Sequence, residues 1–497
     1  MVAASAFVLW AAVSATVVHA HLEPQLRARH LVERQAPAST PASSASSRVA
    51  SATRTRPAAS QTATTAPAAS GNVASSPLAS LSKIGTATTA EATQPLPSTY
   101  AAGATPPVAR APNLPSIANL NPANYPALDR IPPIDSPEVQ QWIKDVDLSQ
   151  APDIPRTQLG ACSNSSNSQA VTDAAKNGWW TCGAHTRATD ITYCPNKNDW
   201  GASFDDGPSP YTPRLLNLLE AQNLKSTFFI VGSRAISRPE MIQTEYMSGH
   251  QLSVHTWAHS TLTTLSNEEI VAELGWTKKI IQDITGVTPN TMRPPYGDID
   301  DRVRYISLKM GLRPVIWTSH NGQTFDTRDW QIGGGTTSAT DAYMNFERFL
   351  GQAQSQLDTG FIVLAHDLSV DLAVDYILPN VINAGQLHIK TIAECLGEGL
   401  AGAYIETADN STQNPLQTST TVAGASGTGF VPGIAPSSGG RTSGSTTRSA
   451  TTSQQSQGAT GSGGTTSGAA GRVSLPSSRL AVVVAMVGPP LWLLLAA

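Results

Sequence analysis

Two adjacent carboxylates, Asp205 and Asp206, follow the apolar residues "WGASF" and precede the turn-forming pair Gly207-Pro208. Adjacent negative charges repel each other, so a fold that holds both against its core needs a cation beside them. Further along the chain, "HTWAH" places His255 and His259 four residues apart, where both imidazoles can face one point. Two imidazole nitrogens and one carboxylate oxygen are the ligands of many catalytic zinc sites, which keep a fourth position for water. The spacing therefore predicts a divalent metal bound by one aspartate and two histidines.

The remaining polar residues supply the groups that a hydrolysis needs. No glutamate follows His255, so the pattern differs from the H-E-x-x-H of zinc proteases, and the second aspartate becomes the candidate general base. Arg293 of "MRPPYG" can restrain that base, and a backbone N–H near Tyr296 can share a developing oxyanion. His366 of "LAHD" can act as general acid, with Asp329 of "DTRDW" orienting its imidazole. With a metal that polarises a carbonyl, this set predicts hydrolysis of an amide or an ester.

Short β-rich runs alternate with helical stretches across the middle of the chain and position these groups. The expected strands are "STFFIVGS", "HQLSVH", "RPVIWTS" and "GFIVLAH". A helix is expected after Pro213, and a second one begins with Ser266 and Glu269 in capping-box spacing and ends at Gly286. Such alternation predicts a parallel sheet, and the length favours a closed or distorted β/α barrel. The polar groups follow apolar runs, so they are expected at the carboxyl ends of the strands, where barrels place active sites.

Five segments taken together resemble the motifs of a known family. In order they are "SFDDGPS", "HTWAH", "RPPYG", "DTRDW" and "VLAHD". They are similar to the motifs of the polysaccharide deacetylases, also called NodB-homology or carbohydrate esterase family 4 enzymes, over about residues 195 to 400. The resemblance implies an α/β fold with a distorted (β/α) barrel. Each motif alone is weak, and five in order are specific.

The resemblance also assigns roles that spacing leaves open. It implies that Asp205 is the catalytic base, supported by Arg293, and that His366 is the acid, supported by Asp329. The implied metal ligands are Asp206, His255 and His259. The implied contacts to the acetyl group are the main chain of Tyr296 and the side chains of Trp330 and Leu364. Two histidines and one carboxylate suit Zn²⁺, and Co²⁺ would be bound by the same set.

Composition divides the rest of the chain. Residues 1–20 are predicted to be a signal peptide, and 155–407 the catalytic domain. Residues 21–150 and 408–470 are predicted to be disordered, Ser/Thr-rich stalks, because long parts of them contain almost no large apolar residue. Residues 471–497 resemble a glycosylphosphatidylinositol (GPI) attachment signal with Gly468 as attachment residue, the alternative being a plain membrane helix. Net charge is −4 without a basic block, which gives nucleic-acid binding no support.

Four cysteines and two sequons indicate passage through the secretory route. Of the three possible disulfide pairings we expect Cys162 with Cys395, which would tie the ends of the domain together, and Cys182 with Cys194. The sequons predict glycosylation at Asn164 and Asn410. The aromatic residues Trp179, Trp180 and Trp200 could stack on sugar rings, but burial in the core is the favoured interpretation.

The layout of signal, stalks and anchor suggests a fungal wall protein, tethered to the membrane by a lipid. Family members with this layout are similar to chitin deacetylases, which implies an amide hydrolase that converts chitin to chitosan and acetate. Two alternatives stay open at this point. One is a deacetylase for another polymer, such as acetylated xylan or a capsule glycan, because the motifs contact the acetyl group and not the chain around it. The other is an inactive wall protein that binds chitin without cleaving it.

Overall fold

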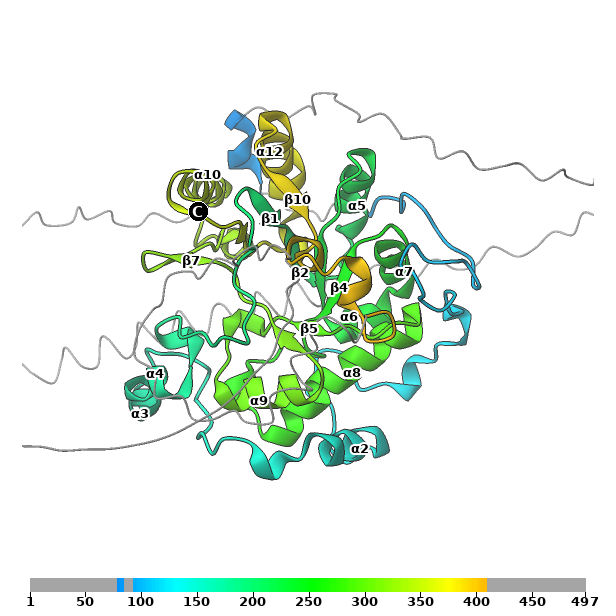
Figure 1. The fold of residues 1–497 in the computed structure, drawn as a ribbon, viewed down its shortest axis with the longest axis vertical. Helices are drawn as coiled ribbons and strands as arrows, with labels where there is room; N and C mark the ends of the chain where they lie inside the picture. The colour runs from blue at the N-terminus through cyan, green and yellow to red at the C-terminus, as the bar shows by residue number, and fades with distance from the viewer. Residues whose placement is uncertain (1–77, 85–92, 409–497) are drawn as a thin grey trace, which may run out of the picture. The chain divides into compact units, whose positions relative to one another are not determined.

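A parallel sheet forms the centre of the protein, for which a computed structural model describes residues 78–84 and 93–408 (Figure 1). Its strand order is β2-β3-β4-β5-β6. The bounds are β2 Ser203–Gly207, β3 Thr227–Ile230, β4 Gln251–Val254, β5 Thr291–Met292 and β6 Arg313–Pro314. Every residue of β2, β3 and β4 is buried, as expected for a parallel sheet that is covered on both faces.

The sheet closes into a ring because the chain segments after β6 and after β9 continue along the sheet and hydrogen-bond to their neighbours. The chain continues past β6 to Thr318, whose N–H donates to Ile362 O (3.0 Å) at the end of β9, Phe361–Ile362. The chain after β9 then reaches β2, where Asp205 N donates to Ala365 O (3.0 Å). The predicted distorted (β/α) barrel is therefore confirmed. A smaller parallel sheet, β10-β1-β9, adjoins this closure, with β1 at Asp199–Gly201 and β10 at His388–Lys390.

Helices surround the barrel, and local capping explains the longest one. The helix α8, Asn267–Thr285, begins with the predicted capping box between Ser266 and Glu269 and ends at Gly286, whose φ of +83° needs a glycine. The other α-helices of the described residues are α2 Pro137–Val146, α3 Ser168–Thr172, α4 Ala174–Asn177, α5 Thr212–Ala221, α6 Gly232–Ser237, α7 Pro239–Met247, α9 Asp301–Lys309, α10 Ala339–Gln356, α11 Val370–Leu372, α12 Leu378–Ala384 and α13 Ile392–Cys395. An antiparallel hairpin joins β7 Ser319–His320 to β8 Gln323–Thr324.

The expectation of a disordered stalk over residues 21–150 is wrong for residues 78–84, where Leu81 is buried in the core, and for residues 93–150, which we call the arm. The arm runs along α7 and α8, and its helix α2 packs against α8 and α9 (Figure 1). Leu114 and Val139 of the arm are buried, and the ring of Trp142 covers Gly275 so closely that no Cβ would fit there. Large apolar side chains recur throughout the arm, unlike in residues 36–77, and most of them pack in or against the core. A composition average over 21–150 hides this placement.

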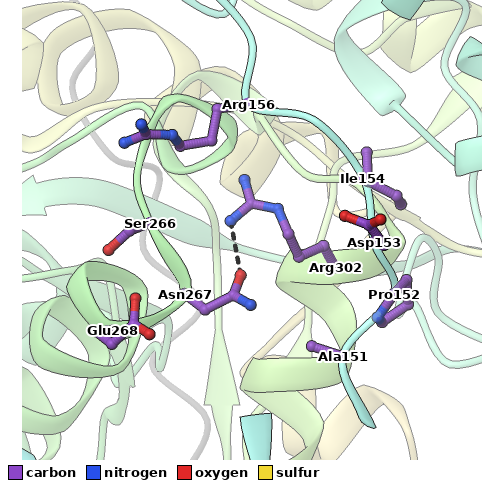
Figure 2. A pocket seen from close by; sticks show the side chains of 9 residues that line it. All are labelled: Ala151, Pro152, Asp153, Ile154, Arg156, Ser266, Asn267, Glu268 and Arg302. Carbon is purple, nitrogen blue, oxygen red and sulfur yellow. Dashed lines mark hydrogen bonds between the residues drawn. The ribbon is translucent and has the colours of Figure 1, made fainter. Parts of the chain in front are cut away.

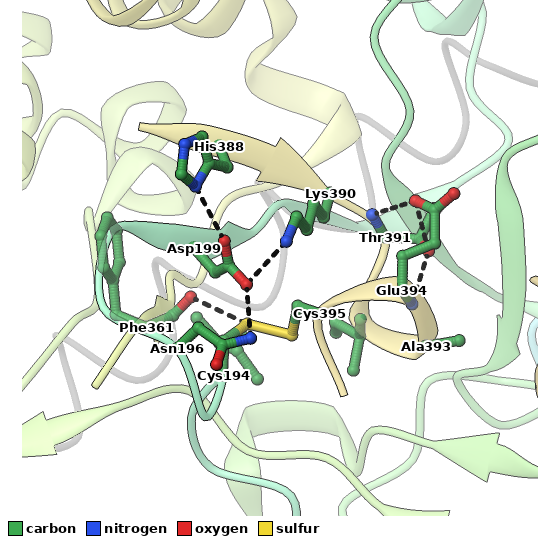
Figure 3. The surroundings of a disulfide bond; sticks show 12 residues. Cys194, Asn196, Asp199, Phe361, His388, Lys390, Thr391, Ala393, Glu394 and Cys395 are labelled. Atoms are coloured by element: carbon green, nitrogen blue, oxygen red, sulfur yellow. Dashed lines mark hydrogen bonds and ion pairs between the residues drawn. A yellow bond between two sulfur atoms is a disulfide. The ribbon is translucent and has the colours of Figure 1, made fainter. Parts of the chain in front are cut away.

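The predicted disulfide pairing is also wrong, although all four cysteines are bonded. Cys162 pairs with Cys182, and Cys194 with Cys395. The reason is the sheet: β1 lies next to β10, so Cys194 before β1 meets Cys395 shortly after β10 (Figure 3). Three tryptophans, Trp179, Trp180 and Trp200, are buried as predicted.

The other predictions concern the two ends of the chain. The signal peptide, the C-terminal stalk, the attachment signal with Gly468, and the sequon at Asn410 lie outside the described residues. Among residues 78–84 and 93–408, no helix combines the length and apolar character that a membrane span requires.

Candidate active site

Three residues from two strand ends form a group that could hold a metal ion. Asp206 belongs to β2, while His255 and His259 follow β4, and their ligand atoms all lie within 4.8 Å of one another. Asp206 Oδ1 is 3.3 Å from His255 Nε2 and 3.0 Å from His259 Nε2. Ligand atoms bound tetrahedrally at about 2.0–2.1 Å from Zn²⁺ lie about 3.4 Å apart, so the spacing fits one ion.

The protonation of these groups fits a cation as well. His255 Nδ1 lies 2.8 Å from the carbonyl oxygen of Arg293, which can only accept, so Nδ1 donates there and Nε2 is the nitrogen that faces Asp206. Asp206 Oδ1 is buried, has no hydrogen bond of good geometry and lies between the two Nε2 atoms. Burial lowers the pKa of His259 below its ordinary value, against the attraction of Asp206, and so favours a neutral ring. A buried carboxylate oxygen without a hydrogen-bond partner, set between two imidazole nitrogens, is a position that a metal ion could fill.

Asp206 itself is held in the charged form. Burial opposes its charge, but His259 and His255 keep the pKa of its carboxyl well below the usual range. Its backbone is left-handed, with φ at +76°, and its carbonyl oxygen accepts a hydrogen bond from Arg234 Nη1. The buried Arg234 was not singled out from sequence. The only signal was a cation in the otherwise apolar stretch "FFIVGSRAI", and its partner became visible only in the fold.

Asp205 and Arg293 form a buried ion pair beside the metal-binding group. Arg293 Nη1 donates to Asp205 Oδ1 (2.6 Å) and to Ser203 Oγ (3.0 Å), and its guanidinium lies 4.0 Å from the ring centre of Phe229. The other carboxylate oxygen of Asp205, Oδ2, lies 3.9 Å from His255 Nε2. Arg293 therefore fixes one oxygen of Asp205 and leaves the other oriented toward the metal-binding group.

His366 and Asp329 form a second pair. His366 Nδ1 lies 2.6 Å from Asp329 Oδ1, and the N–H of His366 donates to Asp329 Oδ2 (2.8 Å). Burial lowers the pKa of His366, but Asp329 and the carboxylates of Asp206 and Asp205 outweigh it and raise this pKa to about 10. The imidazole is thus protonated at neutral pH and able to donate a proton from Nε2.

Comparisons with known proteins agree with this geometry. The sequence pattern of the polysaccharide deacetylases matches residues 192–315. A relative named chitin deacetylase 1, from Cryptococcus neoformans var. grubii, is 53% identical over 371 residues, which cover 73% of this chain and 77% of that protein. The chain belongs to the polysaccharide deacetylase family. The predicted resemblance is confirmed.

Further relatives of the deacetylase are more distant. A chitin deacetylase of Amylomyces rouxii is 34% identical over 271 residues, covering 52% of this chain and 62% of that protein. The solved structure of the chitin deacetylase from Colletotrichum lindemuthianum has a TM-score of 0.39 and 24% identity, covering 44% of this chain and 97% of that one.

The expected acetyl contacts of the deacetylase lie near the pairs described above. Tyr296 has a left-handed backbone, φ +61°, and its ring packs edge-on against His259 at 4.8 Å between centroids. Trp330 follows Asp329 and is 46% exposed, whereas Leu364 is buried. Their contact with an acetyl group stays a prediction.

One hollow of the deacetylase lies elsewhere. It is drawn in Figure 2 and lined by Ala151, Pro152, Asp153, Ile154, Arg156, Ser266, Asn267, Glu268 and Arg302. Arg302 donates there to Asn267 Oδ1 (3.0 Å), which fastens α9 to the start of α8. None of the residues assigned above lines this hollow, so it is separate from the candidate active site.

Proposed function

We propose that this protein is a chitin deacetylase, which hydrolyses the N-acetyl groups of β-1,4-linked N-acetylglucosamine to give chitosan and acetate. The observation that carries the proposal is the arrangement of two pairs around one metal-binding group. The pair of Asp205 and Arg293 offers a carboxylate oxygen, and the pair of His366 and Asp329 offers a protonated nitrogen. The relatives named chitin deacetylases support chitin as the polymer.

In this proposal the metal ligands are Asp206, His255 and His259. An ion held there, Zn²⁺ or Co²⁺, would polarise the acetyl carbonyl and make a water more acidic. Asp205 Oδ2 takes the proton of the attacking water, while Arg293 keeps the carboxylate in place.

In the second half of the reaction, when the C–N bond breaks, the pair of His366 and Asp329 acts. The water oxygen bonds to the acetyl carbon, and the main-chain N–H of Tyr296 donates to the carbonyl oxygen. His366 Nε2 then donates its proton to the amide nitrogen as the C–N bond breaks, so that acetate and a free amine leave. Asp329 holds the His366 ring in orientation and stabilises its positive charge. Trp330 and Leu364 are proposed to line the pocket for the methyl group.

The localisation is proposed to be the cell surface. Two disulfides are typical of proteins in an oxidising compartment outside the cytosol. We extend the proposal to N-glycosylation at Asn164 and Asn410 and to a GPI anchor attached at Gly468, which would keep the enzyme beside the chitin of the wall.

The experiment that tests the function is acetate release from chitin oligomers by the full secreted chain. It is run on the protein as purified, after chelation, and after addition of Zn²⁺ or Co²⁺. Acetate that disappears on chelation and returns with metal supports the reaction and the polymer together. Release only from acetylated xylan or an aryl acetate would overturn chitin as substrate, and no release from any acetylated substrate would overturn the enzyme.

A further inference from the structure

The loop that carries the second metal ligand has an unfavourable backbone. It spans residues 256–260 and links His255 to His259. Thr256 and His259 both adopt left-handed conformations, with φ at +64° and +56°, which residues with a β-carbon avoid. Such a conformation persists only where neighbouring groups impose it. The position of the His259 ring therefore depends on whatever holds this loop.

A carboxylate from α8 restrains the loop by accepting hydrogen bonds from its backbone N–H groups. Glu273, in α8, is fully buried. Its Oε2 accepts hydrogen bonds from the backbone N–H groups of Trp257 (2.7 Å) and Ala258 (2.9 Å), and its Oε1 accepts one from Ser260 Oγ (2.6 Å). Both oxygens of one side chain are thus bonded to consecutive parts of the loop.

The carbonyl side of the loop and its large side chain are held by other elements. The N–H groups of Gly232 and Ser233 donate to the carbonyl oxygens of Thr256 (3.0 Å) and Trp257 (3.1 Å). The fully buried Trp257 donates from Nε1 to Ala127 O of the arm (3.0 Å). The two bonds from Gly232 and Ser233 are backbone–backbone and survive most substitutions, whereas the three bonds to Glu273 all depend on one side chain.

We propose that Glu273 is a positioning residue of the metal site. It fixes the backbone between the two histidines and thereby the place of His259 Nε2 relative to His255 and Asp206. It contacts neither the metal-binding atoms nor the substrate, so it acts through the loop. The inference rests on the metal site of the proposed function, and it adds a residue outside the five sequence motifs.

The test compares two substitutions in the full chain. Glu273→Ala removes all three bonds. Glu273→Gln keeps them, because the amide oxygen can accept from Trp257 and Ala258 while the amide nitrogen donates to Ser260 Oγ. Removing a group hydrogen-bonded directly to a ligating side chain typically weakens metal affinity about 10–100-fold, and Glu273 acts one step further out, through the loop backbone, so the lower end of that range, about 10-fold, applies. We therefore expect that loss for Glu273→Ala and recovery of most of the affinity for Glu273→Gln.

The readouts are Zn²⁺ affinity, by competition with a chromogenic chelator, and the visible absorption spectrum of the Co²⁺-loaded protein. Ile280→Ala is the matched control, because Ile280 is a fully buried residue of the same helix without a hydrogen bond to the loop. It should lower the unfolding temperature but leave Zn²⁺ affinity and the Co²⁺ spectrum unchanged. Glu273→Ala should change the unfolding temperature, the Zn²⁺ affinity and the Co²⁺ spectrum.

Three results would overturn the proposal. They are a folded Glu273→Ala protein that binds Zn²⁺ like the unmodified protein, a Glu273→Gln protein as weak as Glu273→Ala, or an equal loss of affinity in Ile280→Ala. If Glu273→Ala does not fold, Ser260→Ala removes one bond and should give a smaller loss of affinity in the same direction. Failure of the unmodified protein to bind Zn²⁺ or Co²⁺ would instead refute the metal site itself, and this inference with it.

Discussion

Arg293 binds one oxygen of Asp205 and leaves the other oriented toward the metal-binding group, whereas Asp329 binds one nitrogen of His366 and leaves the other to donate. At the scale of residues, the partner of each catalytic candidate thus determines which of its atoms is left to act on the substrate or the water. The two neighbouring aspartates also differ in their partners. Asp205 pairs with the guanidinium of Arg293, and Asp206 lies against the imidazoles of His255 and His259.

This difference in partners predicts that substituting each aspartate affects metal content and activity differently. Asp206→Ala removes a ligand, so the purified protein should lose both its metal and its activity. Asp205→Asn should keep the metal but lose about 10²–10⁴-fold in kcat, because the amide accepts no proton. Metal content by elemental analysis and acetate release measure the two effects. An active Asp205→Asn enzyme, or a metal-loaded Asp206→Ala protein, would reverse the assignment.

The pair of His366 and Asp329 predicts a change in pH dependence. A general acid works below its pKa, so activity is lost as pH rises through that pKa. Burial lowers the pKa of His366 and Asp329 is the largest influence that raises it. Asp329→Asn should therefore move the alkaline limb of kcat to lower pH, by about one unit or more. The exposed Asp341 on α10 provides the control as Asp341→Asn, which should leave the profile in place. An unchanged profile in Asp329→Asn would contradict the role of this pair.

At the scale of elements, the barrel brings together chain segments that are far apart in sequence. The carboxyl ends of β2, β4 and β9 meet at one place, so motifs separated by long helices contribute to one site. The same parallel pairing places β1 against β10 and determines which cysteines meet. The disulfide of Cys194 and Cys395 crosses this pairing, next to the ion pair of Asp199 and Lys390 at 2.8 Å (Figure 3).

The two disulfides should differ in their contribution to stability. The sequence separation is 201 residues for Cys194–Cys395 and 20 for Cys162–Cys182. By loop-closure entropy, removal costs about 5 kcal/mol for the longer loop and about 3 kcal/mol for the shorter one. We expect the double Cys→Ser variant of the first pair to unfold at the lower denaturant concentration. Equal losses, or a greater loss for the short loop, would contradict this order.

At the scale of the whole molecule, the catalytic domain begins earlier than its motifs. The arm covers α8 and contacts the loop between His255 and His259, where Tyr125 stacks on Trp257 with 6.3 Å between ring centres. Trp142 of the arm lies edge-on against Trp276, at 5.6 Å. The arm is thus part of the structure that supports the active site.

Deletion of residues 93–150 should therefore destabilise the domain. It would expose Trp257 and Trp276, which are buried in the intact protein. We expect a lower Tm and a shift of tryptophan emission to longer wavelength. Deletion of residues 21–77, whose composition predicts no packed structure, is the control and should leave both unchanged. Equal Tm values for the two deletions would show that the arm contributes no stability.

The sequence by itself determined the ligand types, the order of the motifs, the alternation of strands and helices, and the capping of α8, because these depend on residue identity and on neighbours a few positions apart. Only the tertiary structure decided which cysteines pair, where the ordered domain begins and which side chains hold the loop of His259. Those features depend on contacts between segments such as Cys194 and Cys395, or Glu273 and Trp257. Composition averages and short-range spacing carry no record of such contacts, since strand pairing and the packing of helices and loops bring the segments together.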